Sequence, residues 1–154
     1  FGNESASYLQ ALFVSARLTC EQGKLEQAEM TLRLIIDTLY HIHEPDVKKI
    51  IAVFVFLATV LTDQRKLEEA EEIHQKVFAI REKNFGVTHP DTLESLSALA
   101  FIASDQGRGE ESEEMYRRVL IAREETLGHD NPITLDTRNK LAFLLNDRGQ
   151  IHEA

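Results

Sequence analysis

Residues 86–111 read GVTHPDTLESLSALAFIASDQGRGEE, and residues 128–153, placed 42 positions later, read GHDNPITLDTRNKLAFLLNDRGQIHE. The two stretches are identical at ten positions: Gly86/Gly128, Pro90/Pro132, Thr92/Thr134, Leu93/Leu135, Leu99/Leu141, Ala100/Ala142, Phe101/Phe143, Asp105/Asp147, Gly107/Gly149 and Glu111/Glu153. A fixed period of this length indicates a solenoid, in which each unit buries its apolar face only against its neighbours. Because such arrays offer a long shaped surface, the period favours a binding protein.

Small residues recur at the same 42-residue step, in two series: Ala16, Ala58, Ala100, Ala142, and Ala28, Ala70, Ser112, Ala154. We expect the first series to lie where the first helix of each unit approaches the second helix closely, and the second series to lie opposite it. A bulky side chain there would cost about 1–3 kcal/mol by overpacking. Larger residues are expected to fill the space between units: Leu57, Leu99, Leu141, Tyr116, Val77 and Val119.

Apolar residues at helical spacing, together with regularly placed Gly and Pro, predict an all-α fold. The expected helices are eight, the last cut short: 4–21, 25–42, 46–63, 67–84, 90–106, 109–127, 132–147, and from 150 onward. Gly23, Gly107 and Gly149 separate the two helices of a unit and suit the left-handed residue that ends a helix. Pro90 and Pro132 suit a first helical turn.

Composition narrows the classes of partner. The formal charge of −9 over 154 residues argues against nucleic acid and against an anionic membrane surface. Cys20 is the single cysteine, so no internal disulfide can form, and we expect a reducing, cytoplasmic compartment. The apolar run 50–61 is too short to span a bilayer. Since the sequence starts at Phe1 and stops at Ala154 inside an expected helix, we interpret it as a segment of a longer protein.

The junctions between units carry a family resemblance. Residues 80–93 read IREKNFGVTHPDTL and residues 122–135 read AREETLGHDNPITL. They resemble the tetratricopeptide repeat of the 42-residue kinesin light chain type, in which a long second helix ends before Leu-Gly, two residues and His-Pro. The resemblance implies a right-handed superhelical α-solenoid of antiparallel helix pairs. It implies a single array of about three and a half units, at approximately 4–43, 46–85, 90–127 and 132–154. The first junction, residues 40–45, departs from the pattern.

In that family the first helices line a concave groove that grips peptide segments. Carried over by position, the groove residues are Gln10, Phe13, Arg17 and Glu21, then Ala52, Val55, Thr59 and Asp63, then Glu94, Ser97, Phe101 and Asp105, then Asp136, Asn139, Phe143 and Asp147. Only Asn139 keeps the family's asparagine that can hydrogen-bond a peptide backbone. The basic groove that captures acidic cargo peptides is not reproduced, and neither is the clamp for a terminal carboxylate.

Two sets of these positions have alternative readings. Glu21, Asp63, Asp105 and Asp147 place one acid per unit near the end of the first helix, where the helix dipole disfavours it by about 0.3–1 kcal/mol. They could contact a basic ligand, but charged faces are usually just solvated, which favours solvation or a bond to a neighbouring backbone. Phe101 and Phe143, with Val55 and Phe13, could form apolar pockets along the groove or fold into the core between units.

The sequence offers little for catalysis. His41, His43 and Glu44 lack a third or fourth ligand at a diagnostic spacing, which favours a surface cluster over a metal or general-base site. His89 suits a capping or packing role, and an isolated, semi-buried Cys20 suits an inert thiol. Phosphate-binding, nucleophile-elbow and zinc-protease motifs are absent from the sequence. We therefore predict no catalysis, metal or cofactor.

The first functional hypothesis is a protein–protein interaction scaffold that binds a partner's peptide segment, with basic and apolar residues, in the groove. The second is a regulatory array within a larger multidomain signalling NTPase, and the third is an enzyme built on a repeat scaffold. Because the last unit would leave an apolar side bare, we also expect either further repeats or self-association through that end.

Overall fold

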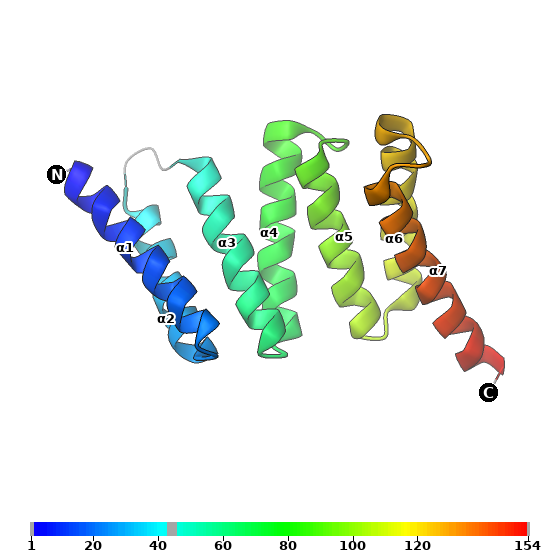
Figure 1. Ribbon diagram of the computed structural model, residues 1–154, viewed down its shortest axis with the longest axis horizontal. Helices are drawn as coiled ribbons and strands as arrows, with labels where there is room; N and C mark the ends of the chain where they lie inside the picture. The colour runs from blue at the N-terminus through cyan, green and yellow to red at the C-terminus, as the bar shows by residue number, and fades with distance from the viewer. Residues whose placement is uncertain (1, 43–45, 154) are drawn as a thin grey trace. The chain divides into compact units, whose positions relative to one another are not determined.

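The computed structural model describes residues 2–42 and 46–153. Within those ranges it contains seven α-helices and no strand (Figure 1): α1 (Gly2–Glu21), α2 (Leu25–Tyr40), α3 (Val47–Asp63), α4 (Leu67–Phe85), α5 (Pro90–Asp105), α6 (Gly109–Leu127) and α7 (Pro132–Glu153). This confirms the all-α helical repeat solenoid predicted from the period. None of these helices is apolar over a long enough stretch to cross a membrane.

The chain divides into two compact units, residues 1–77 and residues 78–154, with the boundary inside α4. In the first unit α1 packs against α2, and α2 packs against α3. In the second unit α5 packs against α6, and α6 packs against α7. Helices that follow one another therefore pack together, as expected when each repeat finds its apolar partner in its neighbour.

The small residues lie where the sequence predicts close approach. Ala16, Ala28, Ala58 and Ala70 in the first unit, and Ala100 and Ser112 in the second, are fully buried. The Ser112 hydroxyl donates a hydrogen bond to the Ala100 carbonyl oxygen at 2.7 Å, so these two positions of α5 and α6 meet directly. The larger residues that were expected to fill the space between repeat units are buried too: Leu57, Leu99, Leu141, Tyr116, Val77 and Val119.

Paired helices are joined by a turn that needs one left-handed residue. Gly107 has φ +80°, and the N–H of the next residue, Arg108, donates to the Ala103 carbonyl at 2.8 Å. Gly23 has the same conformation, with φ +74°. Arg65 occupies the equivalent position, 42 residues from each, with φ +62°. A residue with a Cβ pays about 1–2 kcal/mol for this conformation, so the turn geometry overrides the residue preference at Arg65.

The predicted turn at Gly149 and the predicted eighth helix from residue 150 are wrong. Helix α7 passes through Gly149 and continues to Glu153. At the other turns, the helix that follows is long enough to bury an apolar face against the one before it. At Gly149 the structure shows no such turn, and residues 150–153 continue the helix. Extending α7 keeps its hydrogen-bond ladder unbroken.

One face of α7 is consequently uncovered within the described residues. Leu135 is 40% exposed, whereas its equivalent on α5, Leu93, is 4% exposed under α6. Leu145 is also exposed, and Ala142 is exposed instead of buried as predicted. Ala154, the other small residue assigned to this contact, lies outside the described residues.

We predict opposite effects for Gly107→Ala and Gly149→Ala. Nothing would contact a Cβ at either residue, so the outcome depends on backbone conformation. At Gly107 the left-handed φ should make the change destabilising by about 1 kcal/mol. At Gly149, inside a helix, alanine should stabilise by about 0.5–1 kcal/mol. Urea unfolding followed by circular dichroism measures both, and destabilisation by Gly149→Ala would show that the chain turns there.

Candidate functional site

The predicted groove residues lie on the first helices of the pairs, α1, α3, α5 and α7. In the first unit most are exposed: Gln10, Arg17, Glu21, Ala52, Thr59 and Asp63, with Phe13 and Val55 half-buried. In the second unit the exposed ones are Glu94, Phe101, Asp105, Asp136, Asn139, Phe143 and Asp147. Ser97 differs, because it is buried and offers little surface to a ligand.

The aromatic positions separate into two kinds. Phe101 on α5 is 52% exposed and Phe143 on α7 is 73% exposed, so neither ring belongs to a core. Phe13 on α1 is half-buried and packs edge-on against Phe56 of α3, with ring centroids 5.7 Å apart and planes at 66°. Phe101 and Phe143 therefore present their rings to solvent, whereas Phe13 is partly covered by Phe56.

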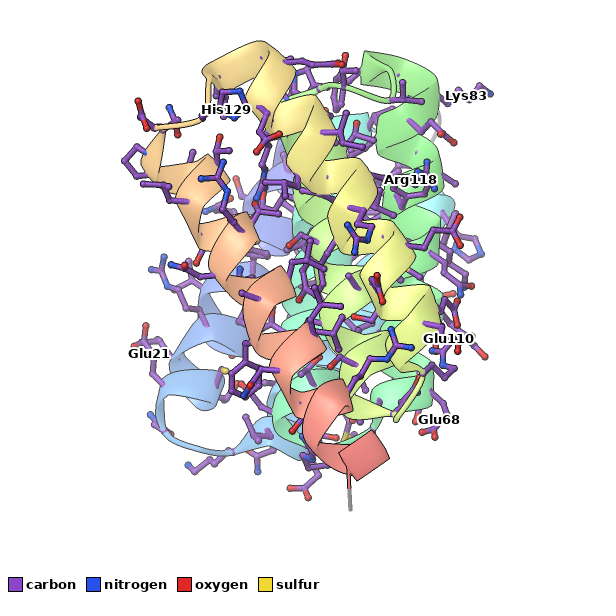
Figure 2. The ribbon with its side chains drawn as sticks, turned by 90° about the vertical axis from the view of Figure 1, so that its right-hand side faces the viewer. Glu21, Glu68, Lys83, Glu110, Arg118 and His129 are labelled. Carbon is purple, nitrogen blue, oxygen red and sulfur yellow. The ribbon has the colours of Figure 1, made fainter. Side chains whose placement is uncertain are left out.

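The four acids near the ends of the first helices are all exposed. Figure 2 shows Glu21, the last residue of α1, pointing away from the helices. The carboxylates of Glu21, Asp63 and Asp147 make no hydrogen bond or ion pair with any side chain that the structure describes. Asp147 lies inside α7, so the penalty from a helix C-terminus does not apply to it. For these three acids, solvation describes the structure better than a bond to a neighbouring backbone.

On the second helix α2, by contrast, an acid is held by hydrogen bonds to two basic side chains. Glu29 of α2, 9% exposed, accepts hydrogen bonds from Lys66 at 2.7 Å and from Arg33 at 2.9 Å. Arg33 also reaches Glu69 of α4 at 2.5 Å. Burial by itself raises the pKa of Glu29, but the hydrogen bonds from Lys66 and Arg33 outweigh it, so the pKa is lowered from its ordinary value. This network links α2 to α4 within the first unit.

The equivalent acid on α6 is Glu113. Its carboxylate accepts a hydrogen bond from Arg117 at 2.9 Å and a second one from Arg148 of α7. These bonds, that from Arg117 foremost, lower the pKa of Glu113. The acid at this position therefore joins neighbouring helices in both units.

Between α6 and α7 the junction is filled by a buried arginine. Arg123 of α6 donates to the Thr137 hydroxyl of α7 at 2.6 Å, and that hydroxyl donates to the Ile133 carbonyl at 3.0 Å. Burial lowers the pKa of Arg123, while Asp136 and Glu94 act in the opposite direction. The equivalent residues Arg81 and Ser95 form the same pair between α4 and α5, at 2.8 Å.

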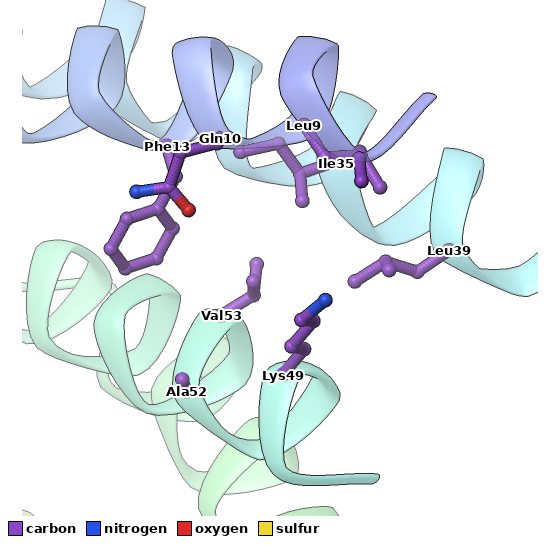
Figure 3. A pocket seen from close by; sticks show the side chains of 9 residues that line it. Leu9, Gln10, Phe13, Ile35, Leu39, Lys49, Ala52 and Val53 are labelled. Carbon is purple, nitrogen blue, oxygen red and sulfur yellow. The ribbon is translucent and has the colours of Figure 1, made fainter. Parts of the chain in front are cut away.

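Between α2 and α3 this pair is missing, because Leu39 and Val53 stand at the equivalent positions. A cavity of about 170 Å³ opens there between α1, α2 and α3 (Figure 3). It is lined by Ala6, Leu9, Gln10, Phe13, Ile35, Leu39, Lys49, Ala52 and Val53. Of these, only Gln10, Phe13 and Ala52 were expected to face a ligand. The available signal was the change from arginine and a hydroxyl to leucine and valine at the first junction.

The residues considered for catalysis have structural surroundings. His41 bonds through Nδ1 to the Asp37 carbonyl at 2.7 Å, and His43 and Glu44 lie outside the described residues. Within the described ranges, no three His, Cys, Asp or Glu residues are grouped so that they could hold a metal ion. His89 caps α5 by accepting from the Asp91 N–H at 3.2 Å, and Cys20 is a half-buried free thiol.

The sequence matches two family models, both described as tetratricopeptide repeat, one over residues 49–108 and the other over residues 92–133. Together they cover residues 49–133, more than half of the chain. The chain belongs to the tetratricopeptide repeat (TPR) family. TPR arrays serve as scaffolds for protein interactions, and the turns, small-residue contacts and exposed first helices described above fit that role. No curated protein matches the sequence at a significant level.

Solved structures share the fold at low identity. BtubC (BKLC) from P. vanneervenii aligns with a TM-score of 0.77 and 17% identity over 94% of this chain, which spans 57% of that protein. A kinesin light chain-like protein from Podosopora anserina with nearly identical TPR-like repeats aligns with a TM-score of 0.77 and 24% identity. That alignment covers 96% of this chain and 70% of the other. The C-terminal TPR-containing domain of a Plasmodium falciparum FK506-binding protein aligns with a TM-score of 0.66 and 17% identity. That alignment covers 100% of this chain and 97% of the other. The fold is therefore that of kinesin light chain-like TPR repeats.

We predict that Glu29→Gln lowers the free energy of unfolding at pH 7 by about 1 kcal/mol, because a neutral amide replaces a charged acceptor. The folded pKa of Glu29 lies below its ordinary value of 4.5, so its stabilisation is complete above that pH and is lost as the pH falls through the folded pKa. The difference between the two proteins should shrink in acid. Urea unfolding at pH 7 and pH 3 measures it.

Glu26→Gln is the matched control, since Glu26 is an exposed acid on the same helix. Glu26→Gln should lower the free energy of unfolding at pH 7 by less than Glu29→Gln does. A loss for Glu29→Gln that stays constant down to pH 3 would contradict the ion-pair explanation.

Proposed function

We propose that this TPR chain binds an extended segment of a partner protein along the exposed faces of its first helices. Membership in a family of interaction scaffolds supports the general role. The finer proposal rests on one observation: Phe101 and Phe143, at equivalent positions on α5 and α7, present their rings to solvent. Fully burying such a side chain is worth about 1.5–3 kcal/mol, and a bound partner would recover the part of it that these half- to three-quarters-exposed rings forgo.

The surroundings of the two rings favour a partner of defined chemistry. Asp105 follows Phe101 by one helical turn, and Asp147 follows Phe143 in the same way. Asn139 lies one turn before Phe143 and is exposed, so its amide is available to a peptide main chain. A segment with apolar side chains over the rings and Lys or Arg over the acids matches this pattern, and the net charge of −9 would speed its approach.

The other two hypotheses stay predictions. No observation among residues 2–42 and 46–153 specifically favours a regulatory array of a signalling NTPase or an enzyme. The cytoplasmic location inferred from cysteine usage also stays a prediction.

We predict that the double variant Phe101→Ala/Phe143→Ala loses affinity for peptides selected on the unmodified protein from a random 12-residue phage library. Selected peptides should combine aromatic or aliphatic residues with Lys or Arg. Each ring is expected to contribute about 1 kcal/mol or more, so the double variant should bind at least tenfold more weakly. Fluorescence polarisation with the labelled peptide measures the dissociation constant.

Ile121→Ala is the control, because Ile121 is a similarly exposed apolar residue on the second helix α6. Its affinity should equal that of the unmodified protein. Asp147→Asn should weaken binding and reduce its salt dependence. Peptides that bind the double variant as tightly as the unmodified protein would refute the proposal.

We further predict self-association through the uncovered face of α7, which includes Leu135, Ala142 and Leu145. Sedimentation equilibrium should show a concentration-dependent dimer. Leu135→Glu should convert it to a monomer, since a carboxylate buried in an apolar contact is costly. A monomer at every concentration of the unmodified protein would contradict this prediction.

A further inference from the structure

The junction of α1, α2 and α3 and the junction of α5, α6 and α7 occupy equivalent places in the repeat, but different side chains occupy them. At the second, the Arg123 side chain enters the junction and bonds Thr137. At the first, the buried Leu39 and Val53 take these two positions, and an aliphatic pair cannot span the same space. The cavity of about 170 Å³ is the volume that remains.

The charges around the two junctions differ. Glu94 and Asp136 face the guanidinium of Arg123, and their equivalents at the first junction are Gln10 and Ala52. Lys49 lines the cavity, and no acid is among its lining residues. Figure 3 shows the Lys49 side chain pointing up into the space, with the Gln10 amide beside Phe13 at the other end. The cavity therefore combines apolar walls with one cation.

The position of Lys49 adds to the argument. It is the third residue of α3, and Lys48 precedes it. Cations are disfavoured at a helix N-terminus, where the dipole attracts anions. The equivalent residues are Pro90 with Asp91, and Pro132 with Ile133. Lys49 makes no ion pair with any residue in the described ranges. The N-terminus of α3 is already capped by Asp46, whose carboxylate accepts a hydrogen bond from the Lys48 N–H at 2.9 Å, so an anion at the mouth of the cavity would be held by the ammonium group of Lys49.

We propose that this cavity binds a small amphiphilic carboxylate, with its apolar group between α1 and α3 and its carboxylate on Lys49. A cavity of roughly 150 Å³ lined by Leu, Ile and Phe is large enough for benzene, so this one accepts a single ring or a branched alkyl group. Except for Lys49 in the first turn of α3, its lining residues lie inside helices, where their backbone groups are already engaged. The cavity offers one ammonium and one side-chain amide, which suit a free acid better than a peptide main chain.

The cavity shares Gln10, Phe13 and Ala52 with the predicted groove, but Phe101 and Phe143, on which the proposed peptide binding rests, do not line it. The two proposals are therefore tested by different variants. The probes are 4-phenylbutyrate and its neutral analogue 4-phenylbutanol. Titrations followed by 1H–15N correlation spectra should show saturable shifts at residues lining the cavity. The acid should bind at least fivefold more tightly than the alcohol.

Lys49→Met should remove that difference between acid and alcohol, because only the charge contact is lost. Lys48→Met is the matched control: Lys48 is an exposed neighbour that does not line the cavity, and its variant should behave as the unmodified protein. Leu39→Arg/Val53→Thr transplants the filled junction of α6 and α7 and should abolish binding of both probes. Should this buried variant fail to fold, Ala52→Phe blocks the cavity from an exposed position.

Several results would overturn the proposal. These are no saturable shift at the lining residues, equal binding of acid and alcohol, or unchanged binding by Lys49→Met. A fourth is a peptide ending in phenylalanine that saturates the same residues when 4-phenylbutyrate does not. That last result would assign the cavity to a peptide terminus instead of a free acid.

Discussion

Within the described residues, the pairs α1 with α2, α3 with α4, and α5 with α6 each bury two small side chains that let one helix approach the next. At Ala100 and Ser112 the approach is close enough for a side-chain hydroxyl to bond the opposing main-chain carbonyl, at 2.7 Å. A larger residue would push the pair apart, and the leucines and valines around it would lose their contacts. The 42-residue spacing of these residues therefore sets where each helix pair packs. The residues at the other positions determine which side chains each pair exposes to solvent.

That division explains why equivalent junctions can differ in chemistry without a change of fold. Arg123 with Thr137 and Arg81 with Ser95 fill two junctions with a charge-assisted hydrogen bond. Leu39 and Val53 keep the helices in place at a third, since both are buried, but leave a space beside Lys49. The helix pairs are held elsewhere, by small-residue contacts and by networks such as that of Glu29. The junction is consequently free to be filled or hollow.

The sequence predicted the fold well because its evidence is local and repeated. Helix bounds followed from apolar spacing and from the glycines at positions 23 and 107, and they agree with the structure within two residues for α1 to α6. Gly149 misled the prediction, because a glycine permits a left-handed turn but cannot cause one. The turn also requires a following helix that gains enough burial to offset a broken hydrogen-bond ladder. How much surface a following helix buries depends on how the whole chain packs, and a local sequence pattern does not show it.

The candidate sites were harder to predict from the sequence than the fold was, for two physical reasons. Whether Phe101 and Phe143 are core or exposed depends on a helix rotation of a few tens of degrees, which periodicity does not resolve at the edge of an apolar stripe. The cavity beside Lys49 arises from a departure from the repeat, and matched positions draw attention to what is shared. In a repeat protein, shared residues report mainly on packing between neighbours. Positions where one junction differs from its equivalents, such as Leu39, Val53 and Lys49, are therefore where a specific ligand can be recognised.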